Sequence, residues 1–113
     1  MKPGRLALAK FPYGGMVGAK LRPVLLLSGP LGTTPEFLVA YITSIIPKGL
    51  LPTDMLLDPM LPEHSGTNLK TPSLLRLHKL ATIHRTDIVR LTGQLSPAAW
   101  SMVETKLRLL LNL

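Results

Sequence analysis

The stretch that most restricts the fold reads SLLRLHKLATIH and spans Ser73–His84. We predict a long β-strand here, and successive side chains on a strand point to opposite faces. The apolar residues at odd positions are expected on the core face, and they are Leu75, Leu77, Ala81 and Ile83. Arg76 and His78 are expected side by side on the other face, about 6–7 Å apart. Such a pair is suited to gripping a phosphate, and a solvated strand face is the alternative.

Proline and glycine divide the rest of the chain into short apolar segments. The 113 residues include 11 prolines and 9 glycines, a pattern that favours a barrel or sandwich of short strands over a helical bundle. The polar segment 59–72 is expected to be a loop. We expect residues 1–113 to form one domain. Five further strands are predicted, at Arg5–Lys10, Arg22–Ser28, Glu36–Thr43, Asp54–Asp58 and Ile88–Thr92.

The C-terminal segment is predicted to be a helix. Ser96 is a favourable N-cap residue, Pro97 suits the first helical position, and helix-tolerant residues follow up to Leu111. An apolar stripe at helical spacing comprises Trp100, Val103, Leu107 and Leu110. We expect this stripe to close the core, in preference to binding a partner helix or a membrane. The predicted fold class is therefore mainly β with a C-terminal α-helix.

Composition and charge exclude several classes of protein. Hydrophobic residues make up 46% of the chain, which argues against a disordered basic tail. Cysteine is absent, so disulfide scaffolds, zinc–thiolate sites and cysteine nucleophiles are excluded. No apolar run approaches the ~20 residues of a membrane helix, and the N-terminal run is shorter than the ~7 residues of a signal-peptide core. We therefore expect a cytoplasmic protein without a membrane span.

A net charge of +7 and a pI near 10.3 indicate a polyanionic partner, either a nucleic acid or an acidic protein. His64, His78 and His84 are too dispersed to predict a metal site, and the six acidic residues form no clear pair. We therefore expect no metal and no cofactor. The glycine-rich segment 14–20 fits no nucleotide-loop spacing and is expected to be a flexible loop that brings Lys20 and Arg22 to an anionic ligand.

Several blocks of sequence, taken in order, are similar to one known family. They are GRLALAKFP at 4–12, the glycine-rich loop, RPVLLLS at 22–28, YITS at 41–44, LKTPSLL at 69–75, TGQLS at 92–96 and the terminal LLLNL at 109–113. Together they resemble the MazF/PemK toxins of type II toxin–antitoxin systems. The similarity runs nearly from end to end.

The resemblance implies an SH3-like β-barrel of the CcdB/PemK type with a C-terminal helix. It also implies a homodimer and a metal-independent, ribosome-independent endoribonuclease that an acidic antitoxin neutralises. The matching motifs place the family's catalytic positions on Arg22, Thr43 and, from the PemK branch, Arg76. Many members carry Asp-Gln-x-Arg where this chain has residues 78–81, HKLA, and the PemK branch has a histidine where this chain has Met16.

The residues lead to a hypothesis for the chemistry on single-stranded RNA. The 2′-hydroxyl would attack the neighbouring phosphorus and leave 2′,3′-cyclic phosphate and 5′-hydroxyl ends. Arg22 would stabilise the developing charge, Thr43 would hold the phosphate, and Arg76 would add a second cation. His78 is the candidate base or acid, because imidazole exchanges protons near neutral pH. Three further residues are expected to bind RNA, namely Lys20, Ser44 and Lys79.

Two other functions fit the same sequence. The first is a module that binds RNA or protein without cutting it. The second is a toxin aimed at a protein, like the gyrase-poisoning toxins of similar fold. Binding to RNA should weaken with salt, with a log–log slope of about −0.7 per neutralised phosphate. Poisoning of a protein should persist without RNA.

Overall fold

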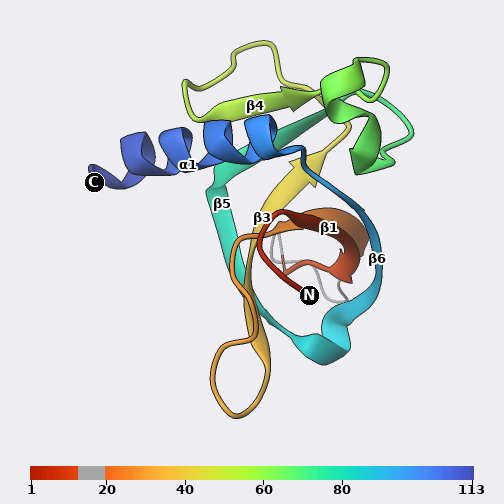
Figure 1. The fold of residues 1–113 in the computed structure, drawn as a ribbon, viewed down its shortest axis with the longest axis vertical. Helices are drawn as coiled ribbons and strands as arrows, with labels where there is room; N and C mark the ends of the chain where they lie inside the picture. Colours follow the sequence, from red (N-terminus) through yellow and green to blue (C-terminus); the bar gives the residue numbers. More distant parts are fainter. Residues whose placement is uncertain (13–19) are drawn as a thin grey trace.

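The computed structural model describes residues 1–12 and 20–113, in which six antiparallel strands form one sheet and a helix lies against one end of it (Figure 1). The order of the strands across the sheet is β4-β5-β3-β2-β1-β6. The predicted glycine-rich loop and Met16 lie outside the described residues. The elements are β1 Arg5–Lys10, β2 Leu21–Leu26, β3 Glu36–Thr43, β4 Asp54–Leu57, η1 Pro62–Thr67, β5 Ser73–His84, η2 Arg85–Asp87, β6 Ile88–Gln94 and α1 Pro97–Leu111.

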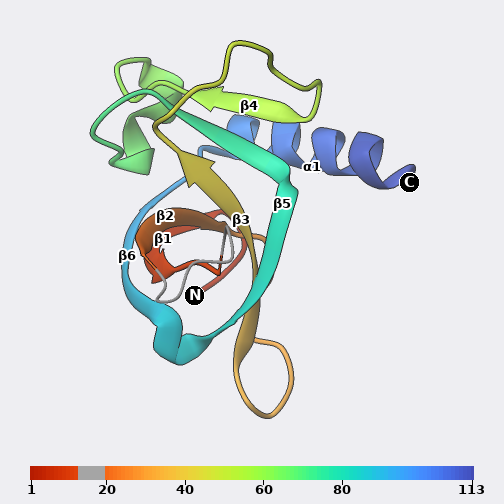
Figure 2. The same ribbon diagram turned by 180° about the vertical axis from the view of Figure 1, so that it is seen from behind.

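The sheet curls strongly without closing. Figures 1 and 2 show β5 and β6 on opposite sides of β1 and β2, with the short 3-10 helix η2 joining them. The β1–β6 ladder contains two register shifts, and such irregularities increase the local bend of a strand. In the described part of the chain, β4 and β6 are the edge strands. The predicted mainly β fold with a C-terminal helix is confirmed, in the form of an open, barrel-like sheet.

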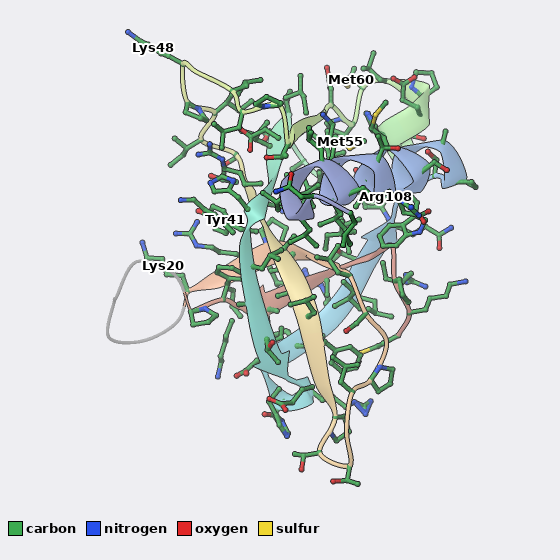
Figure 3. The ribbon with its side chains drawn as sticks, turned by 90° about the vertical axis from the view of Figure 1, so that its left-hand side faces the viewer. Lys20, Tyr41, Lys48, Met55, Met60 and Arg108 are labelled. Carbon is green, nitrogen blue, oxygen red and sulfur yellow. The ribbon has the colours of Figure 1, made fainter. Side chains whose placement is uncertain are left out.

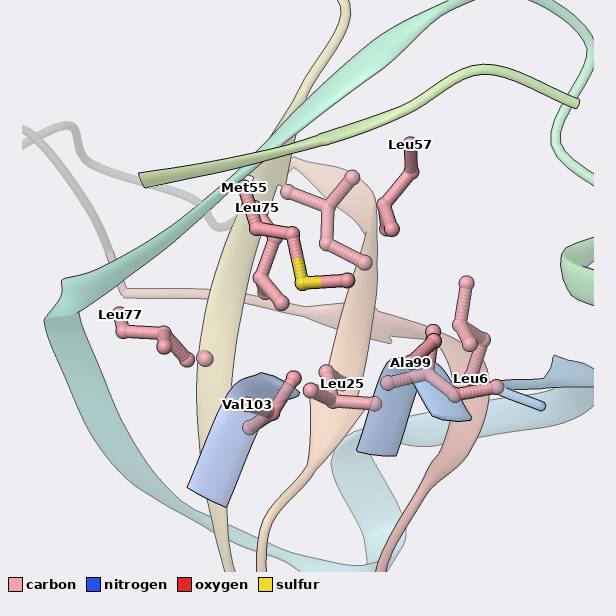
Figure 4. Packing of buried hydrophobic residues seen from close by; sticks show 11 residues of the cluster. Leu6, Leu25, Met55, Leu57, Leu75, Leu77, Ala99 and Val103 are labelled. Carbon is pink, nitrogen blue, oxygen red and sulfur yellow. The ribbon is translucent and has the colours of Figure 1, made fainter. Parts of the chain in front are cut away.

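Two hydrophobic clusters pack on the two faces of the curled sheet, because alternate residues of β1, β2 and β3 contribute to each. Figure 4 shows the first, in which Ala99 and Val103 of α1 face side chains from β1, β2, β4 and β5. Its strand residues include Leu6, Leu25, Ile42, Met55, Leu57, Leu75 and Leu77. The second cluster fills the inside of the curl and comprises Ala7, Ala9, Phe11, Val24, Leu26, Phe37, Val39, Tyr41 and Ile83.

Helix α1 begins and packs as the sequence predicts. The Ser96 hydroxyl oxygen accepts a hydrogen bond from the Ala99 N–H at 3.1 Å, and Pro97 follows the cap. Val103 is fully buried in the first cluster, and the other three stripe residues, Trp100, Leu107 and Leu110, pack against it. The helix ends where Asn112 adopts the left-handed conformation at φ 57°. The apolar stripe of α1 therefore packs against the hydrophobic core, as predicted.

The predicted strand limits differ from the observed ones at four ends, which belong to three strands. The second strand spans Leu21–Leu26, β4 ends at Leu57, and β6 continues to Gln94 because Gly93 and Gln94 pair with β1. The predicted loop 59–72 contains the 3-10 helix η1, with proline in its first turn. Its last residue, Thr67, is buried, and η1 packs against β6. This packing of η1 against β6 fixes the position of the segment that follows η1.

A large irregularity in β5 overturns the predicted single core face. In the β3–β5 ladder, Ala40 pairs with Leu80 but the next residue, Tyr41, pairs with Arg76, so residues 77–79 form an insertion. The insertion reverses the parity of the strand. Leu75 and Leu77 therefore face the first cluster, whereas Ala81 and Ile83 face the second. Leu74 is an even-numbered residue, which in a regular strand would share the outer face with Arg76 and His78, and it is fully buried.

Candidate functional site

Thr43, the last residue of β3, lies in the wall between two surface grooves. The first groove encloses about 470 Å³, and the second about 280 Å³. Polar side chains that line the first are Arg22, Thr43, Ser44, Asn68, Lys70, Thr71, Ser73, Arg90 and Thr92. The second is lined by Tyr41, Thr43, Ile45, Pro47, Arg76 and Lys79.

The hydroxyl of Thr43 fixes the turn that leaves β3. Its Oγ1 accepts a hydrogen bond from the Ile45 N–H at 3.1 Å and lies 3.5 Å from the Ile45 carbonyl oxygen. Thr43 is only 7% exposed, whereas Ser44, the next residue, is exposed and lines the first groove. This side chain-to-backbone turn gives the chain a defined path between the two grooves.

The Tyr41 ring contacts one cationic side chain from each of the two grooves. The Arg22 guanidinium carbon lies 5.4 Å from the centre of the Tyr41 ring, and the Lys79 ammonium nitrogen lies 5.8 Å from it. Both distances are typical of cation–π contacts. Phe11 packs against the same ring, with the two ring centres 5.2 Å apart, and Tyr41 is only 6% exposed. A buried aromatic ring therefore holds one cation from each groove.

Asp54 on β4 anchors the third cation of the site. Its carboxylate accepts two hydrogen bonds from Arg76, from Nε at 3.1 Å and from Nη2 at 3.2 Å. The Asp54 side chain is fully buried, whereas the Arg76 side chain keeps 17% of its area exposed. His78 Nδ1 lies 3.9 Å from the same carboxylate. Arg76 and His78 therefore both lie near the Asp54 carboxylate, and His78 does so from the insertion in β5 and not from a regular strand face.

The lining of both grooves is electrically positive. Among the residues that the structure describes, the linings carry five cationic side chains and no carboxylate. In Figure 3, Lys20, Tyr41 and Lys48 lie toward one side of the molecule, and Arg108 and Met60 lie toward the other. Converging cations on one face create a potential that attracts anions. The arrangement is therefore suited to binding a polyanion across Thr43.

The structure brings most of the predicted site residues together. Arg22, Thr43 and Ser44 meet at the first groove, and Thr43, Arg76 and Lys79 meet at the second. His78 lies near Asp54, with its Nδ1 3.9 Å from the carboxylate, and it is outside the linings of both grooves. Lys20 is exposed just before β2, at the border of the described residues.

Sequence reasoning missed the uncharged polar residues of segment 68–73 and Thr92, and it also missed four charged or aromatic residues of the site: Tyr41, Asp54, Lys70 and Arg90. Tyr41 carried a usable signal, because it precedes Thr43 by two positions on a strand and so shares its face. Asp54 carried no signal, because the six acidic residues form no clear pair in the sequence and its partner Arg76 is 22 positions away. Lys70 and Arg90 reach the first groove through the tertiary fold.

Within residues 1–12 and 20–113, no group of three or more histidine, aspartate or glutamate side chains is placed to hold a metal ion. The same residues contain no helix long and apolar enough to cross a membrane.

The sequence matches a family model, and the fold has a counterpart among solved structures. The family described as "PemK-like, MazF-like toxin of type II toxin-antitoxin system" matches residues 2–111, and the chain belongs to this family. A solved structure described as "Endoribonuclease in complex with its cognate antitoxin from Mycobacterial species" has a similar fold, with a TM-score of 0.71 and 18% sequence identity. The likeness covers 100% of this chain and 96% of that one. No protein of curated function matches the sequence. The resemblance inferred from the sequence motifs is confirmed.

Proposed function

We propose that this toxin is a metal-independent endoribonuclease that cleaves single-stranded RNA in the cytoplasm. The observation that carries the proposal is the position of Thr43 between two grooves, with Arg22 lining one and Arg76 the other. A phosphate bound at Thr43 would have guanidinium groups on both sides. Planar guanidinium groups suit phosphate oxygens, and their charge stabilises the extra negative charge of a phosphorane transition state.

The proposed reaction uses the RNA's own nucleophile. The 2′-oxygen forms a bond to the adjacent phosphorus, and its proton passes to the imidazole of His78. The bond between phosphorus and the 5′-oxygen breaks, and that oxygen takes up a proton from water. The imidazolium of His78 returns its proton to water, so the reaction consumes no net proton. The products are a 2′,3′-cyclic phosphate and a 5′-hydroxyl. Arg22 and Arg76 supply the positive charge that a metal ion would otherwise provide.

The proposed partners follow from the charge and from the family. An acidic antitoxin would neutralise the toxin by covering its cations, because the net charge of +7 attracts an oppositely charged chain. Lys20, Ser44 and Lys79 would contact the RNA backbone beside the catalytic residues. We also propose that the active form is a homodimer, as the resemblance to the family implies.

The proposal predicts cleavage of a long single-stranded RNA by the purified protein in the presence of EDTA. We expect cuts at a short recurring sequence, with cyclic phosphate and 5′-hydroxyl ends that are mapped by primer extension and by end labelling. Cleavage that required added Mg²⁺ would contradict the proposed chemistry.

A folded protein that leaves several varied RNAs intact would contradict the proposed activity itself. Binding that weakens steeply with salt would then indicate an RNA-binding module. Inhibition of a protein target in the absence of RNA would indicate a protein-directed toxin.

Replacement of His78 by alanine is expected to lower the rate constant for RNA cleavage by about 100-fold, because a proton-transfer group is lost. The expected effect is at the low end of such losses, since 29% of the side chain is exposed and water can approach its place. Binding of an uncleavable 2′-deoxy analogue and the melting temperature should change little. Unchanged cleavage kinetics would remove His78 from the mechanism.

A further inference from the structure

We infer that Asp54 is a positioning residue for RNA cleavage, which orients the Arg76 guanidinium at the second groove and the His78 imidazole beside it. The inference rests on the proposed function. It assigns to β4 a part in the reaction, although β4 contributes no residue to the lining of either groove in the described chain.

The carboxylate of Asp54 is held from several directions. Oδ1 accepts from Arg76 Nε at 3.1 Å, and Oδ2 accepts from Arg76 Nη2 at 3.2 Å and from the Leu51 N–H at 2.8 Å. The Asp54 N–H in turn donates to the Leu51 carbonyl oxygen at 2.9 Å. The carboxylate is therefore fixed by the backbone of its own turn, independently of any ligand.

Because the Asp54 carboxylate is completely buried, its negative charge requires the positive charge and the hydrogen bonds of Arg76. A buried charge is tolerated where it is paired and hydrogen-bonded, and Arg76 supplies both kinds of contact. The paired Nε and Nη2 form one edge of the planar guanidinium, so two parallel bonds set the orientation of the whole plane. The N–H groups on the opposite edge of the guanidinium remain available to donate hydrogen bonds to a ligand in the second groove, which Arg76 lines.

His78 lies within the reach of the same carboxylate. Its Nδ1 is 3.9 Å from Asp54 Oδ1, which is beyond a hydrogen bond but within the range of an ion pair. The residue belongs to the three-residue insertion of β5, which places it near Asp54 rather than opposite β3. An imidazole with Nδ1 toward a carboxylate directs Nε2 away from it, as a proton-transfer group requires.

The test is the replacement of Asp54 by asparagine, which keeps the size of the side chain and an acceptor oxygen but removes the charge. We expect kcat for RNA cleavage to fall roughly 10- to 100-fold, because a misplaced guanidinium and imidazole lose transition-state contacts. KM should change less than about threefold, because the groove cations remain. The matched control is Asp58→Asn, since Asp58 caps a loop by accepting from the Met60 N–H and lies outside both grooves.

A second variant, Arg76→Lys, keeps a positive charge beside the buried carboxylate and so guards against loss of the fold. An ammonium group cannot form the two parallel bonds, and we expect a fall in kcat similar to that of Asp54→Asn. Because both variants remove one arrangement, the loss in Asp54→Asn/Arg76→Lys should be much smaller than the product of the single losses.

The outcomes separate this inference from the proposed function. Cleavage by the wild type together with an unchanged kcat in Asp54→Asn overturns the positioning role alone. Losses in the double variant that equal the product of the single losses do the same. A wild type that cuts no RNA overturns the proposed function and this inference with it.

Discussion

Replacement of Arg22 by alanine is expected to lower kcat/KM for RNA cleavage by about 100- to 1,000-fold, the range found when one preorganised group at a transition state is removed. Arg22 lines the first groove beside Thr43, and its guanidinium lies 5.4 Å from the centre of the buried Tyr41 ring. The aromatic contact holds the cation in place before RNA binds, so little reorganisation is needed during the reaction. Initial rates on a short labelled RNA that contains the mapped cleavage sequence will measure the loss.

The matched control for Arg22 is Arg108→Ala. Arg108 is exposed in the last turn of α1 and, in Figure 3, lies on the other side of the molecule from Lys20. Both variants lower the net charge by one, so a loss confined to Arg22→Ala reports on the site and not on the overall field. Equal losses in the two variants, or full activity of Arg22→Ala with an unchanged melting temperature, would contradict the catalytic role.

Local sequence signals predicted the positions of the strands and of the helix well. They did not predict the register of β5 against β3. Proline and glycine spacing located all six strands, and the Ser96-Pro97 cap located the helix. The insertion in β5 was not predictable, because an uninterrupted run such as LHKL carries no local sign of a change in parity. The helix η1 was missed for a related reason, since its stability comes from packing against β6.

The sequence could predict a site residue only where a motif within one strand, or directly beside it, indicates that residue. Thr43 ends β3, Ser44 follows it directly, and Arg22 lies on the neighbouring strand, so a motif could indicate each of them. The pairing of Asp54 with Arg76 joins residues 22 positions apart, and it depends on the register of β4 against β5. Charge pairs of that kind become visible only with the tertiary structure.

The contact between η1 and β6 also connects the stability of the fold to the first groove. Asn68, which follows η1, donates a hydrogen bond from Nδ2 to the Thr92 carbonyl oxygen at 2.8 Å. The same segment supplies Asn68, Leu69, Lys70 and Thr71 to the lining of the groove. Close packing between η1 and β6 therefore holds one wall of the groove.

Replacement of Gly93 by alanine is expected to destabilise the protein by about 3 kcal/mol, in the range of overpacking substitutions. A Cβ atom at Gly93 would lie 2.5 Å from the Thr67 carbonyl carbon and 2.6 Å from the Gly66 carbonyl oxygen, and closer still to the Thr67 oxygen. All three neighbours are backbone atoms, so β6 and η1 would have to separate. For a chain of this size the melting temperature should fall by about 10 °C, measured by circular dichroism.

The control for Gly93 is Gly29→Ala, where an added Cβ meets nothing within 4 Å. Its free energy of unfolding should stay within about 1 kcal/mol of the wild type. Because the segment directly after η1 forms one wall of the first groove, the Gly93 variant should also bind the 2′-deoxy RNA analogue more weakly at temperatures where it remains folded. An unchanged melting temperature for Gly93→Ala would show that β6 and η1 can separate with little loss of stability. The wall of the first groove would then be positioned by Asn68 and by the strand that follows it, β5.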